Sequence, residues 1–504
     1  MGEKLIDDFG DDNKDPKPPV PGVPSENPLV DDFHEAPVSS VVPPQTVPAQ
    51  APAQAPAFSE DLFGSLDEGK LKSITDAFPK DLVKKMGQVS GAVPPIAPAP
   101  AAQAVPLPSG PLGWVVRFVR ENIECLVVAA ILALVIRHFI FEPFQIPTGS
   151  MATTLLGKHV MLTCDHCGWD WARSIDEKAS AAEVESPQCP HCLQTSRGGT
   201  YPAWGGEKII ANKMVYRFGF REPRRFETVV FHPPTQPHLN YIKRIVGFGG
   251  EELMIRAGDV FINGKIERKP LDIQRTVWIP VYSSRHDIKG TQFFAPEDTW
   301  TRNLDGSGRL TSYTCRNLHD RVTHWLRWER GAERSQASRS IWNAMSYVSR
   351  EPTAEVGDLK IEGMAVLKEA GGSFIVEILD GPERWKLEIG NACRLIAFQG
   401  PTEIRRVDIP YRIVPGAPFR FSLENWDSSG RVELGEGEGV VTASFDIDPV
   451  GGRQGEYSFR IGVQDSDAGI TDLKVFRDIY YTPGDITSGD IERKFQVEKD
   501  SFFA

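Results

Sequence analysis

The chain contains little cysteine, no excess of positive charge and, in its first 110 residues, no tryptophan or tyrosine. Seven cysteines in 504 residues are too few to hold together a disulfide scaffold. A formal charge of −12, with 56 Lys and Arg against 68 Asp and Glu, gives no support to nucleic-acid binding, which needs a basic face. At roughly 150 residues per domain, the length suggests about three domains with room for a large core.

Proline and negative charge are concentrated at the N-terminus. Residues 1–110 hold 19 of the 40 prolines and carry −8 of the total charge of −12. Low hydrophobicity and Pro/Ala repeats favour extended, solvated backbone. We therefore expect 1–110 to be a disordered, Pro/Ala-rich acidic tail. Only 71–86 has the pattern of a short amphipathic helix, which we interpret as a transient solvated element.

The most apolar part of the chain, 114–141, predicts a transmembrane helix. Twelve uncharged residues separate Glu124 from Arg137, which alone is short for a crossing of about 20 residues. The aliphatic stem of Arg137 can lie along apolar surface while its charge stays in water, and the aromatic residues that follow lengthen the segment. A helix buried in a soluble core is the alternative. More than 110 residues precede the segment, so it is not a cleavable signal sequence.

Basic residues near the ends of this helix predict its orientation. Arg117 and Arg120 precede the apolar core, with two lysines further back, whereas Arg137 and Lys158 follow it. Cytoplasmic flanks carry the excess of Lys and Arg. We therefore expect a single-pass protein of the cytoplasmic (inner) membrane, in contact with lipid, with a cytoplasmic N-terminus and an external, periplasmic body.

Alternating apolar and polar residues predict a mainly β body. In 201–270, short strands surround Asn263-Gly264, a pair typical of a type I′ hairpin turn because both positions need positive φ. A polar connecting region, 271–350, leads to 350–480, where strands recur at the spacing of a jelly-roll-like β-sandwich. The final segment, 481–504, is expected to return as a strand to the first β-domain, which makes the sandwich an insertion.

Two features of the sandwich segment have functional alternatives. Its acidic loop residues are interpreted as solvated carboxylates rather than calcium ligands; they are Asp446, Asp448, Asp465 and Asp467. Trp426 fits either stacking on a sugar or a place in the core. We favour a structural or protein-contact role for the sandwich over glycan binding.

A candidate nucleophile directly follows the apolar segment. The string FIFEPFQIPTGSMATTLL places Ser150 in a turn formed by Pro147, Thr148 and Gly149. Turns rich in Ser, Thr and Gly are common, so this string alone is weak evidence for catalysis.

A candidate base, Lys243, lies beside Arg244 in the apolar strand YIKRIVGFGG. Side chains alternate across a strand, so only one of these two needs to be buried. Lowering the pKa of Lys243 from about 10.4 by about three units, at about 4 kcal/mol, would give an uncharged amine able to accept a serine proton. This is the chemistry of a Ser-Lys dyad. The alternative is an edge-strand lysine with its ammonium group in water.

Taken together, several segments resemble bacterial type I signal peptidases. They are FQIPTGSMATTL, GEKIIANKMVY, RFETVVFHPP and YIKRIVGFGGE, in family order behind the apolar helix. The resemblance spans about 115–270, apart from a cysteine-bearing insertion. It implies a membrane-anchored serine endopeptidase that removes N-terminal signal peptides from secretory preproteins after a small-x-small motif. The nucleophile segment would be 142–163, and no organic cofactor and no nucleic acid are implied.

The same resemblance implies roles for individual residues. Ser150 is the nucleophile, and Lys243 is the general base that later returns the proton to the leaving amine. The main-chain N–H of Ser150 and the hydroxyl of Thr148 form the oxyanion hole. Thr148 stands where many members have serine, and Thr153 stands where the family has proline. Neither difference removes a catalytic group.

The family's last box, a Gly-Asp-Asn stretch followed by Ser and Asp-Ser-Arg, has no counterpart here. FQVEKDSFFA resembles the strand that leads into it, and TPGDITSGD, with Asp485, Ser488 and Asp490, is only a superficial substitute. We expect either a truncated or frameshifted sequence, or an impaired copy in which the lysine is mispositioned. The alternative to an active enzyme is therefore a catalytically impaired, membrane-anchored scaffold or adaptor.

Four of the cysteines have the spacing of a zinc ribbon within 164–200. They form two Cys-x2-Cys pairs separated by 21 residues, namely Cys164, Cys167, Cys189 and Cys192. A structural zinc is expected, with two disulfides as the alternative in an oxidising compartment. His166 and His191 lie inside the pairs and are expected to point away from the metal. The remaining cysteines are expected to be buried; they are Cys125, Cys315 and Cys393.

Overall fold

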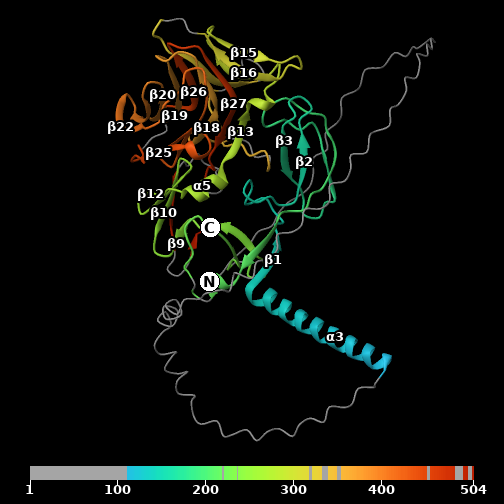
Figure 1. The fold of residues 1–504 in the computed structure, drawn as a ribbon. Coiled ribbons are helices and arrows are strands. Elements are labelled where there is room, and N and C mark those ends of the chain that lie inside the picture. The colour runs from blue at the N-terminus through green and yellow to red at the C-terminus, as the bar shows by residue number, and fades with distance from the viewer. Residues whose placement is uncertain are drawn as a thin grey trace, which may run out of the picture. The chain divides into compact units, whose positions relative to one another are not determined.

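The structure is a computed structural model whose described residues begin at Gly110 (Figure 1). They are 110–217, 219, 221–234, 236–316, 320–331, 339–348, 353–450, 455–482, 492–497 and 502–503. Apart from Gly110, the tail expected over 1–110 lies outside them, as does the helix expected at 71–86. Asp485, Ser488 and Asp490 also lie outside them.

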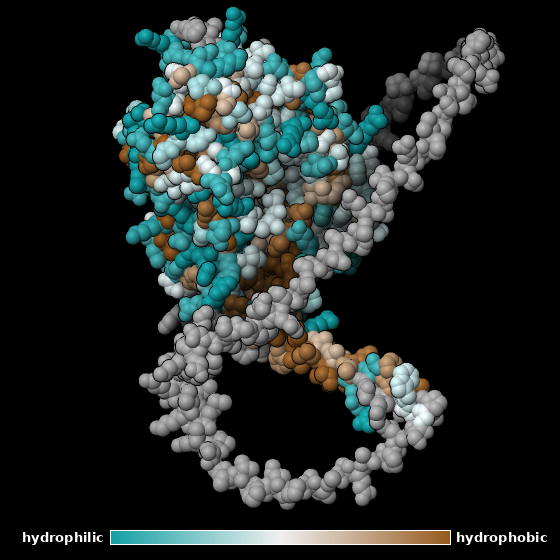
Figure 2. All heavy atoms as spheres, viewed as in Figure 1, coloured by the Kyte–Doolittle hydropathy of each residue, from teal (hydrophilic) through white to brown (hydrophobic). Residues whose placement is uncertain are grey.

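A long helix, α3 (Pro111–Val135), continues into the π-helical segment η2 (Ile136–Ile140). The stretch Gly113–Ile140 spans 28 residues and contains a window with a mean hydropathy of 2.3, and this window is 0% buried. Figure 2 shows the apolar side chains exposed along this helix. A helix of this length and composition can cross a membrane, and its exposure contradicts the alternative of a buried core helix.

The expectation that the three remaining cysteines are buried is correct for two of them. Cys315 and Cys393 are buried, whereas Cys125 is exposed. Cys125 lies on α3, whose apolar window is not covered by any described part of the chain.

Small antiparallel sheets make up the region between the helix and the sandwich, which we call the peptidase region after the family that its sequence resembles. They are β1 (Phe141–Gln145) with β6 (Lys208–Asn212), β7 (Thr228–Phe231) with β8 (Tyr241–Arg244), β9 (Gly247–Phe248) with β29 (Phe502–Phe503), and β12 (Lys265–Ile266), β11 (Asp259–Ile262), β10 (Glu252–Arg256) and β28 (Glu492–Gln496) in that order. Asn263 and Gly264 join β11 to β12 with φ values of 50° and 80°, which confirms the expected hairpin turn. β28 pairs with β10 after the chain has passed through the sandwich.

The cysteine-bearing segment forms two hairpins, and short helices connect the neighbouring elements. The hairpins are β2 (His159–Thr163) with β3 (Asp170–Ser174) and β4 (Ala181–Val184) with β5 (Gly199–Pro202). The helices are α4 (Met214–Arg217) and α5 (Leu271–Val277), and α5 leads from the peptidase region into the sandwich.

Two antiparallel sheets form the β-sandwich. The first has the order β15 (Trp300–Leu304), β16 (Leu310–Cys315), β27 (Ala468–Arg477), β18 (Leu359–Leu367), β23 (Pro418–Trp426), β24 (Ser429–Leu434) and β25 (Val441–Asp446), with β13 (Ile279–Ser283) also paired to β27. The second has the order β14 (Gln292–Pro296), β17 (His324–Gly331), β26 (Glu456–Gln464), β19 (Ser373–Gly381), β20 (Glu383–Ile389), β21 (Cys393–Gln399) and β22 (Thr402–Ile409). The connections include η3 (Ser284–His286) and η5 (Gly437–Gly439).

Aromatic side chains from the two sheets meet in the core of the sandwich. The ring of Phe374 on β19 lies 5.1 Å from that of Phe421 on β23, and Trp385 on β20 lies 5.4 Å from Phe445 on β25. The strict in-out alternation of β18 matches the one-sided apolar pattern seen in the sequence. The expected mainly β architecture with a sandwich is confirmed.

The segment 271–350, expected to be a polar connection, instead supplies strands β13 to β17 to the two sheets. Tyr282, Phe294 and Trp328 from this segment are buried in the core. Register shifts interrupt the pairing of β13, β14 and β15, so the apolar positions do not alternate regularly along the sequence.

Trp426 belongs to the core rather than to an exposed sugar platform. It is 7% exposed, and its indole N–H donates to the carbonyl of Lys269 at 3.3 Å. Of the loop carboxylates, Asp446 and Asp448 are exposed, as a solvated role requires.

Candidate functional site

Ser150 lies in the loop between β1 and β2, and its side chain is exposed. The loop is closed at its base, where Lys158 N–H donates to the carbonyl of Pro147 at 3.1 Å. Within the loop, Ala152 N–H donates to the carbonyl of Gly149 at 3.0 Å, which forms a tight turn around Ser150. A short, closed loop therefore presents the hydroxyl of Ser150 to its surroundings.

Packing holds this loop on both sides of Ser150. Met151 and Ala152, which directly follow it, are 9% and 5% exposed. On the other side, Gly157 lies against the main chain of Thr148, where a Cβ on Gly157 would be 2.3 Å from the carbonyl carbon. Only glycine permits so close an approach, so the position of Thr148 depends on Gly157.

The ring of Tyr347 lies against the turn that carries Ser150. A Cβ on Gly149 would be 2.0 Å from Cε1 of Tyr347. The ring is 2% exposed, and its hydroxyl donates to the carbonyl of Lys158 at 3.5 Å. Nothing in the sequence near Ser150 indicates this contact, because Tyr347 comes from the segment that enters the sandwich.

Adding a methyl group at Gly149 is expected to destabilise the protein through this contact. Gly149→Ala should lower the free energy of unfolding by about 1–3 kcal/mol, the usual cost of overpacking. In the double variant with Tyr347→Ala the clash is absent, so the two losses should be less than additive. Urea unfolding measures all three variants. Gly306→Ala is the control, because no atom lies within 4 Å of its Cβ position. Strictly additive losses would contradict the contact.

Lys243 lies on β8 opposite Val229 of β7 and is half-buried. Burial lowers the pKa of Lys243 from its usual value because the charged ammonium loses hydration. The neighbouring Arg244 is the more deeply buried of the two, at 9% exposed, and donates to the carbonyl of Phe226 at 2.7 Å. The alternation of the strand therefore separates a buried guanidinium from a half-buried amine.

Within the described residues, no hydrogen bond joins Ser150 to Lys243, and the amine of Lys243 forms no ion pair. The side chain of Thr148 is exposed. The structure therefore places each predicted group on its own element without assembling them into a hydrogen-bonded dyad. Serine and lysine remain a predicted pair.

The two cysteine pairs converge on one point. The four sulfur atoms all lie within 4.8 Å of one another, with Cys164 Sγ 3.6 Å from Cys192 Sγ and Cys167 Sγ 3.7 Å from Cys189 Sγ. A disulfide needs about 2.05 Å. Sulfurs on one tetrahedral zinc, each about 2.3 Å from the metal, lie about 3.8 Å apart. The geometry fits metal coordination and not the alternative of two disulfides.

Both histidines inside the cysteine pairs have partners outside the sulfur cluster. His191 stacks on Trp169 with ring centres 4.6 Å apart and accepts a hydrogen bond from the Ser283 N–H at 3.2 Å. Burial lowers its pKa to about 3, so His191 is neutral at pH 7. His166 contacts the carbonyl of Thr195 through Nε2 at 3.1 Å.

The buried guanidinium of Arg330 lies close to the sulfur cluster. It donates to the carbonyl of Pro190, between the second pair of cysteines. Burial lowers the pKa of Arg330 to about 10. Negative charge at Cys189 and Cys192 acts in the opposite direction and raises it, but by less. Four thiolates around a divalent metal carry a net charge of about −2, so a nearby cation is favourable.

A family match covers the segment that carries Ser150 and Lys243. Residues 119–167 and 195–293 match the family described as signal peptidase, peptidase S26. These residues are similar in sequence to that family. The matched residues include the loop of Ser150 and strand β8 with Lys243, whereas 168–194 is not matched.

Curated bacterial relatives carry the same family name. Signal peptidase I of Rickettsia akari is 29% identical over 174 residues, which cover 34% of this chain and 51% of the relative. The enzyme of Rickettsia felis is 28% identical over 162 residues (32% and 47%), and that of Buchnera aphidicola is 31% identical over 129 residues (26% and 29%). The chain thus spans about half the length of the first of these relatives.

Solved structures show only distant likeness. A carbohydrate-binding module from Bacillus subtilis is 9% identical with a TM-score of 0.23, covering 37% of this chain and 95% of its own. A galectin from Caenorhabditis elegans is 9% identical with a TM-score of 0.19, covering 31% of this chain and 95% of its own. TM-scores this low give no basis for assigning a function.

Proposed function

We propose that this chain is a membrane-anchored serine endopeptidase that removes signal peptides from preproteins with Ser150 and Lys243. The observation that carries the proposal is that both residues lie in the segment matched to the signal peptidase family. The exposure of Ser150 and the lowered pKa of Lys243 support it, because a nucleophile must be accessible and its base must be uncharged. Cleavage of a purified preprotein by the purified full chain tests it.

The proposed chemistry follows the logic of a serine hydrolase. The Oγ of Ser150 attacks the scissile carbonyl carbon while its proton passes to the uncharged amine of Lys243. When the tetrahedral intermediate collapses, the carbon–nitrogen bond breaks, and the Lys243 ammonium gives that proton to the leaving amine. Lys243 then takes a proton from water, whose oxygen attacks the ester on Ser150 and releases the signal peptide. As the ester bond breaks, the Lys243 ammonium gives this proton to the Oγ of Ser150, so the hydroxyl and the uncharged amine are restored.

The proposed oxyanion hole consists of the main-chain N–H of Ser150 and the hydroxyl of Thr148. The Ser150 N–H donates to no main-chain carbonyl of the described residues, so it is available to a substrate oxygen. One such donor is worth about 3–4 kcal/mol in the transition state. The packing of Gly157 against Thr148 would help to hold the second donor in place.

The proposed topology places the reaction at the outer surface of the cytoplasmic membrane. The apolar helix α3 and its continuation would cross the cytoplasmic membrane, with the N-terminus inside and the peptidase region outside. Strand β1 follows η2 directly, so the Ser150 loop would lie a few residues beyond the membrane. A signal peptide that ends in a small-x-small motif leaves the bilayer at the same level, which makes preproteins the proposed substrates.

The sulfur cluster is proposed to bind one structural zinc ion. The donor set consists of Cys164, Cys167, Cys189 and Cys192, and four thiolates complete a tetrahedral shell without an open position. Crowding of the thiols raises the pKa of Cys167, chiefly because Cys189 and Cys192 hydrogen-bond its protonated form. A zinc ion would remove this conflict by replacing the shared protons.

Elemental analysis of the purified chain is expected to find one zinc per molecule. Cys167→Ser removes one of the four sulfurs and should lower the zinc affinity by more than about tenfold. Cys393→Ser is the control, because this buried cysteine is not part of the sulfur cluster. A metal-free wild-type protein in which the four cysteines fail to react with a thiol reagent would contradict the zinc site and indicate disulfides.

A further inference from the structure

A cavity of about 280 Å³ lies between the peptidase region and the sandwich. The wall from the peptidase region comes from the turn between β10 and β11, including Gly258 and Asp259. The wall from the sandwich includes the residues before β18 and the hairpin between β19 and β20. Five carboxylate side chains line this space, and we call it the acidic cavity; they are Asp259, Glu355, Asp358, Asp380 and Glu383.

Two of these carboxylates, Asp259 and Asp358, converge with Asp427, which lies between β23 and β24 beside the cavity. Carboxylate oxygens of Asp259, Asp358 and Asp427 all lie within 4.8 Å of one another. Calcium binds oxygen at about 2.3–2.6 Å, so two oxygens in one calcium shell are separated by at most about 5 Å. The spacing of the three carboxylates therefore fits a single ion without rearrangement of the main chain.

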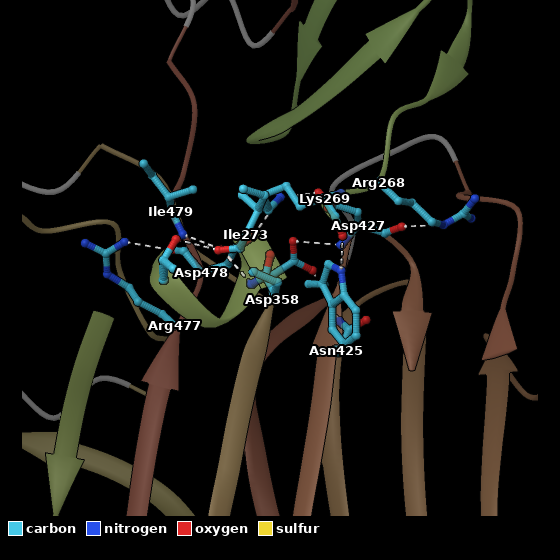
Figure 3. Close-up of polar contacts among 12 residues, drawn as sticks. Arg268, Lys269, Ile273, Asp358, Asn425, Asp427, Arg477, Asp478 and Ile479 are labelled. Carbon is cyan, nitrogen blue, oxygen red and sulfur yellow. Dashed lines mark hydrogen bonds and ion pairs between the residues drawn. The ribbon is translucent and has the colours of Figure 1, made fainter. Parts of the chain in front are cut away.

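Lys269 compensates only part of the negative charge beside the acidic cavity. Its ammonium, buried with 2% exposed, lies 2.5 Å from Asp427 and 2.9 Å from Asp478 (Figure 3). It forms no ion pair with Asp259 or Asp358 among the described residues. Burial, together with the negative charges nearby, raises the pKa of both Asp259 and Asp358 well above the usual value. The charge of Lys269 acts on Asp259 without a direct ion pair and offsets this rise only in part.

The amide of Asn425 forms hydrogen bonds with carboxylates that Lys269 does not pair with. Its Nδ2 donates to Asp380 at 3.0 Å and to Asp358 at 3.3 Å, and Figure 3 shows Asn425 close to Asp358 and Asp427. An amide carries no net charge, so these hydrogen bonds orient the carboxylates without neutralising them. Asn425 thus holds the carboxylates in place but supplies no positive charge to stabilise their ionised forms.

Glu383 gives an independent indication of a ligand. It is 5% exposed, lines the acidic cavity, and has one carboxylate oxygen, Oε2, without any hydrogen-bond partner. Its other oxygen accepts hydrogen bonds from Ser428 at 3.3 Å and from Val450 N–H at 3.1 Å. A buried carboxylate oxygen without a partner is costly unless a cation or another donor faces it.

We propose that the acidic cavity binds a calcium ion through Asp259, Asp358 and Asp427, with Glu383 facing the same ion directly or through water. Carboxylate oxygens in an irregular arrangement suit calcium, whereas magnesium demands a nearly ideal octahedron. Asp259 belongs to the peptidase region, and the other three residues belong to the sandwich. The ion therefore joins the two parts, and its removal loosens the sandwich from the peptidase region.

Calorimetric titration of the full chain with CaCl2, after treatment with EGTA, tests the proposal. EGTA prefers calcium, and the sulfur cluster is monitored separately by zinc analysis. One calcium ion per chain is expected, together with an increase of several degrees in the melting temperature. Terbium should bind in its place and luminesce on excitation at 280 nm, because Tyr480 lines the cavity. The weakest calcium sites in proteins have a Kd of about 1 mM, so a wild-type chain that binds no calcium at about 10 mM overturns the proposal.

Isosteric amide variants locate the ion. Asp259→Asn and Asp358→Asn should each weaken calcium binding by more than about tenfold and abolish the terbium signal. Without calcium, Asp259→Asn should melt at or above the wild-type temperature, because it removes a carboxylate from a crowded acidic site. Asp358→Asn should melt somewhat lower, because both oxygens of Asp358 accept hydrogen bonds, from Asn425 and from the Asp427 N–H, and an amide can accept only one of them. Asp448→Asn, in an exposed loop, is the matched control and should leave calcium affinity unchanged. Unchanged affinity in both cavity variants would overturn the assignment. Preprotein cleavage is not needed as a readout, so failure here leaves the proposed peptidase activity unaffected.

Discussion

Ser150→Ala is expected to reduce preprotein cleavage by the purified chain by a factor of about 10⁴ or more. The variant removes the atom that forms the acyl-enzyme, and loss of one member of such a catalytic unit costs nearly as much as loss of the whole unit. The melting temperature should stay nearly unchanged, because the side chain is exposed and forms no hydrogen bond with a described residue. The measurement is the initial rate of cleavage, followed by gel and mass spectrometry.

Two further variants make this result specific. Ser180→Ala changes an exposed serine in the cysteine-bearing segment and should cleave at the wild-type rate. Ser150→Cys keeps a nucleophile at the same position and should retain part of the activity. If Ser150→Ala cleaves the preprotein at a rate within tenfold of the wild type, Ser150 is not the nucleophile.

Among the single substitutions proposed for this chain, Lys269→Met is expected to cause the largest loss in the free energy of unfolding. Burial disfavours the charge on Lys269, but Asp427 and Asp478 outweigh that effect and raise its pKa well above 10.5. Removing the ammonium leaves two buried carboxylates, 1% exposed each, without their cation. Breaking a buried pair in this way costs about 3–5 kcal/mol.

Urea unfolding at pH 7 measures this loss. A group whose folded-state pKa is raised stabilises the protein fully below its unfolded value near 10.5, so the whole effect is present at pH 7. Lys368→Met is the control, because its pair with Asp467 at 3.3 Å is 65% exposed on the lysine side and should contribute at most about 1 kcal/mol. Equal losses in the two variants would contradict the structural role of Lys269.

The sequence predicted those features that depend on local pattern. The apolar stretch that became α3, the Asn263-Gly264 turn and the alternation of strands such as β18 follow from rules that act over a few residues. The segment 271–350 was interpreted as a connection because bulges disturb the alternation of its strands. Its strands are recognisable only in the sheet, where β27 and β26 provide their partners.

The candidate sites were also predictable only where they depend on residues that are close together in the sequence. The cysteine spacing indicated the sulfur cluster because both pairs form their own tight turns, with Gly168 N–H bonded to the carbonyl of Cys164 at 2.9 Å. The packing of Tyr347 on Gly149 was not predictable, because it joins distant segments. The acidic cavity was also missed, because Asp259 begins strand β11, Asp358 precedes β18 and Asp427 follows β23, and no local pattern links the three.

The pH dependence of kcat/KM for preprotein cleavage tests most directly the claim that Lys243 supplies an uncharged amine to Ser150. Because burial lowers the pKa of Lys243, the rate should rise with pH through an apparent pKa below the usual 10.5. Lys243→Met should remove the activity together with this ascending limb, and Arg244→Lys should retain both. This role of Lys243 would be contradicted if kcat/KM of Lys243→Met rose with pH as in the wild type. It would also be contradicted if the wild-type rise had an apparent pKa at or above 10.5.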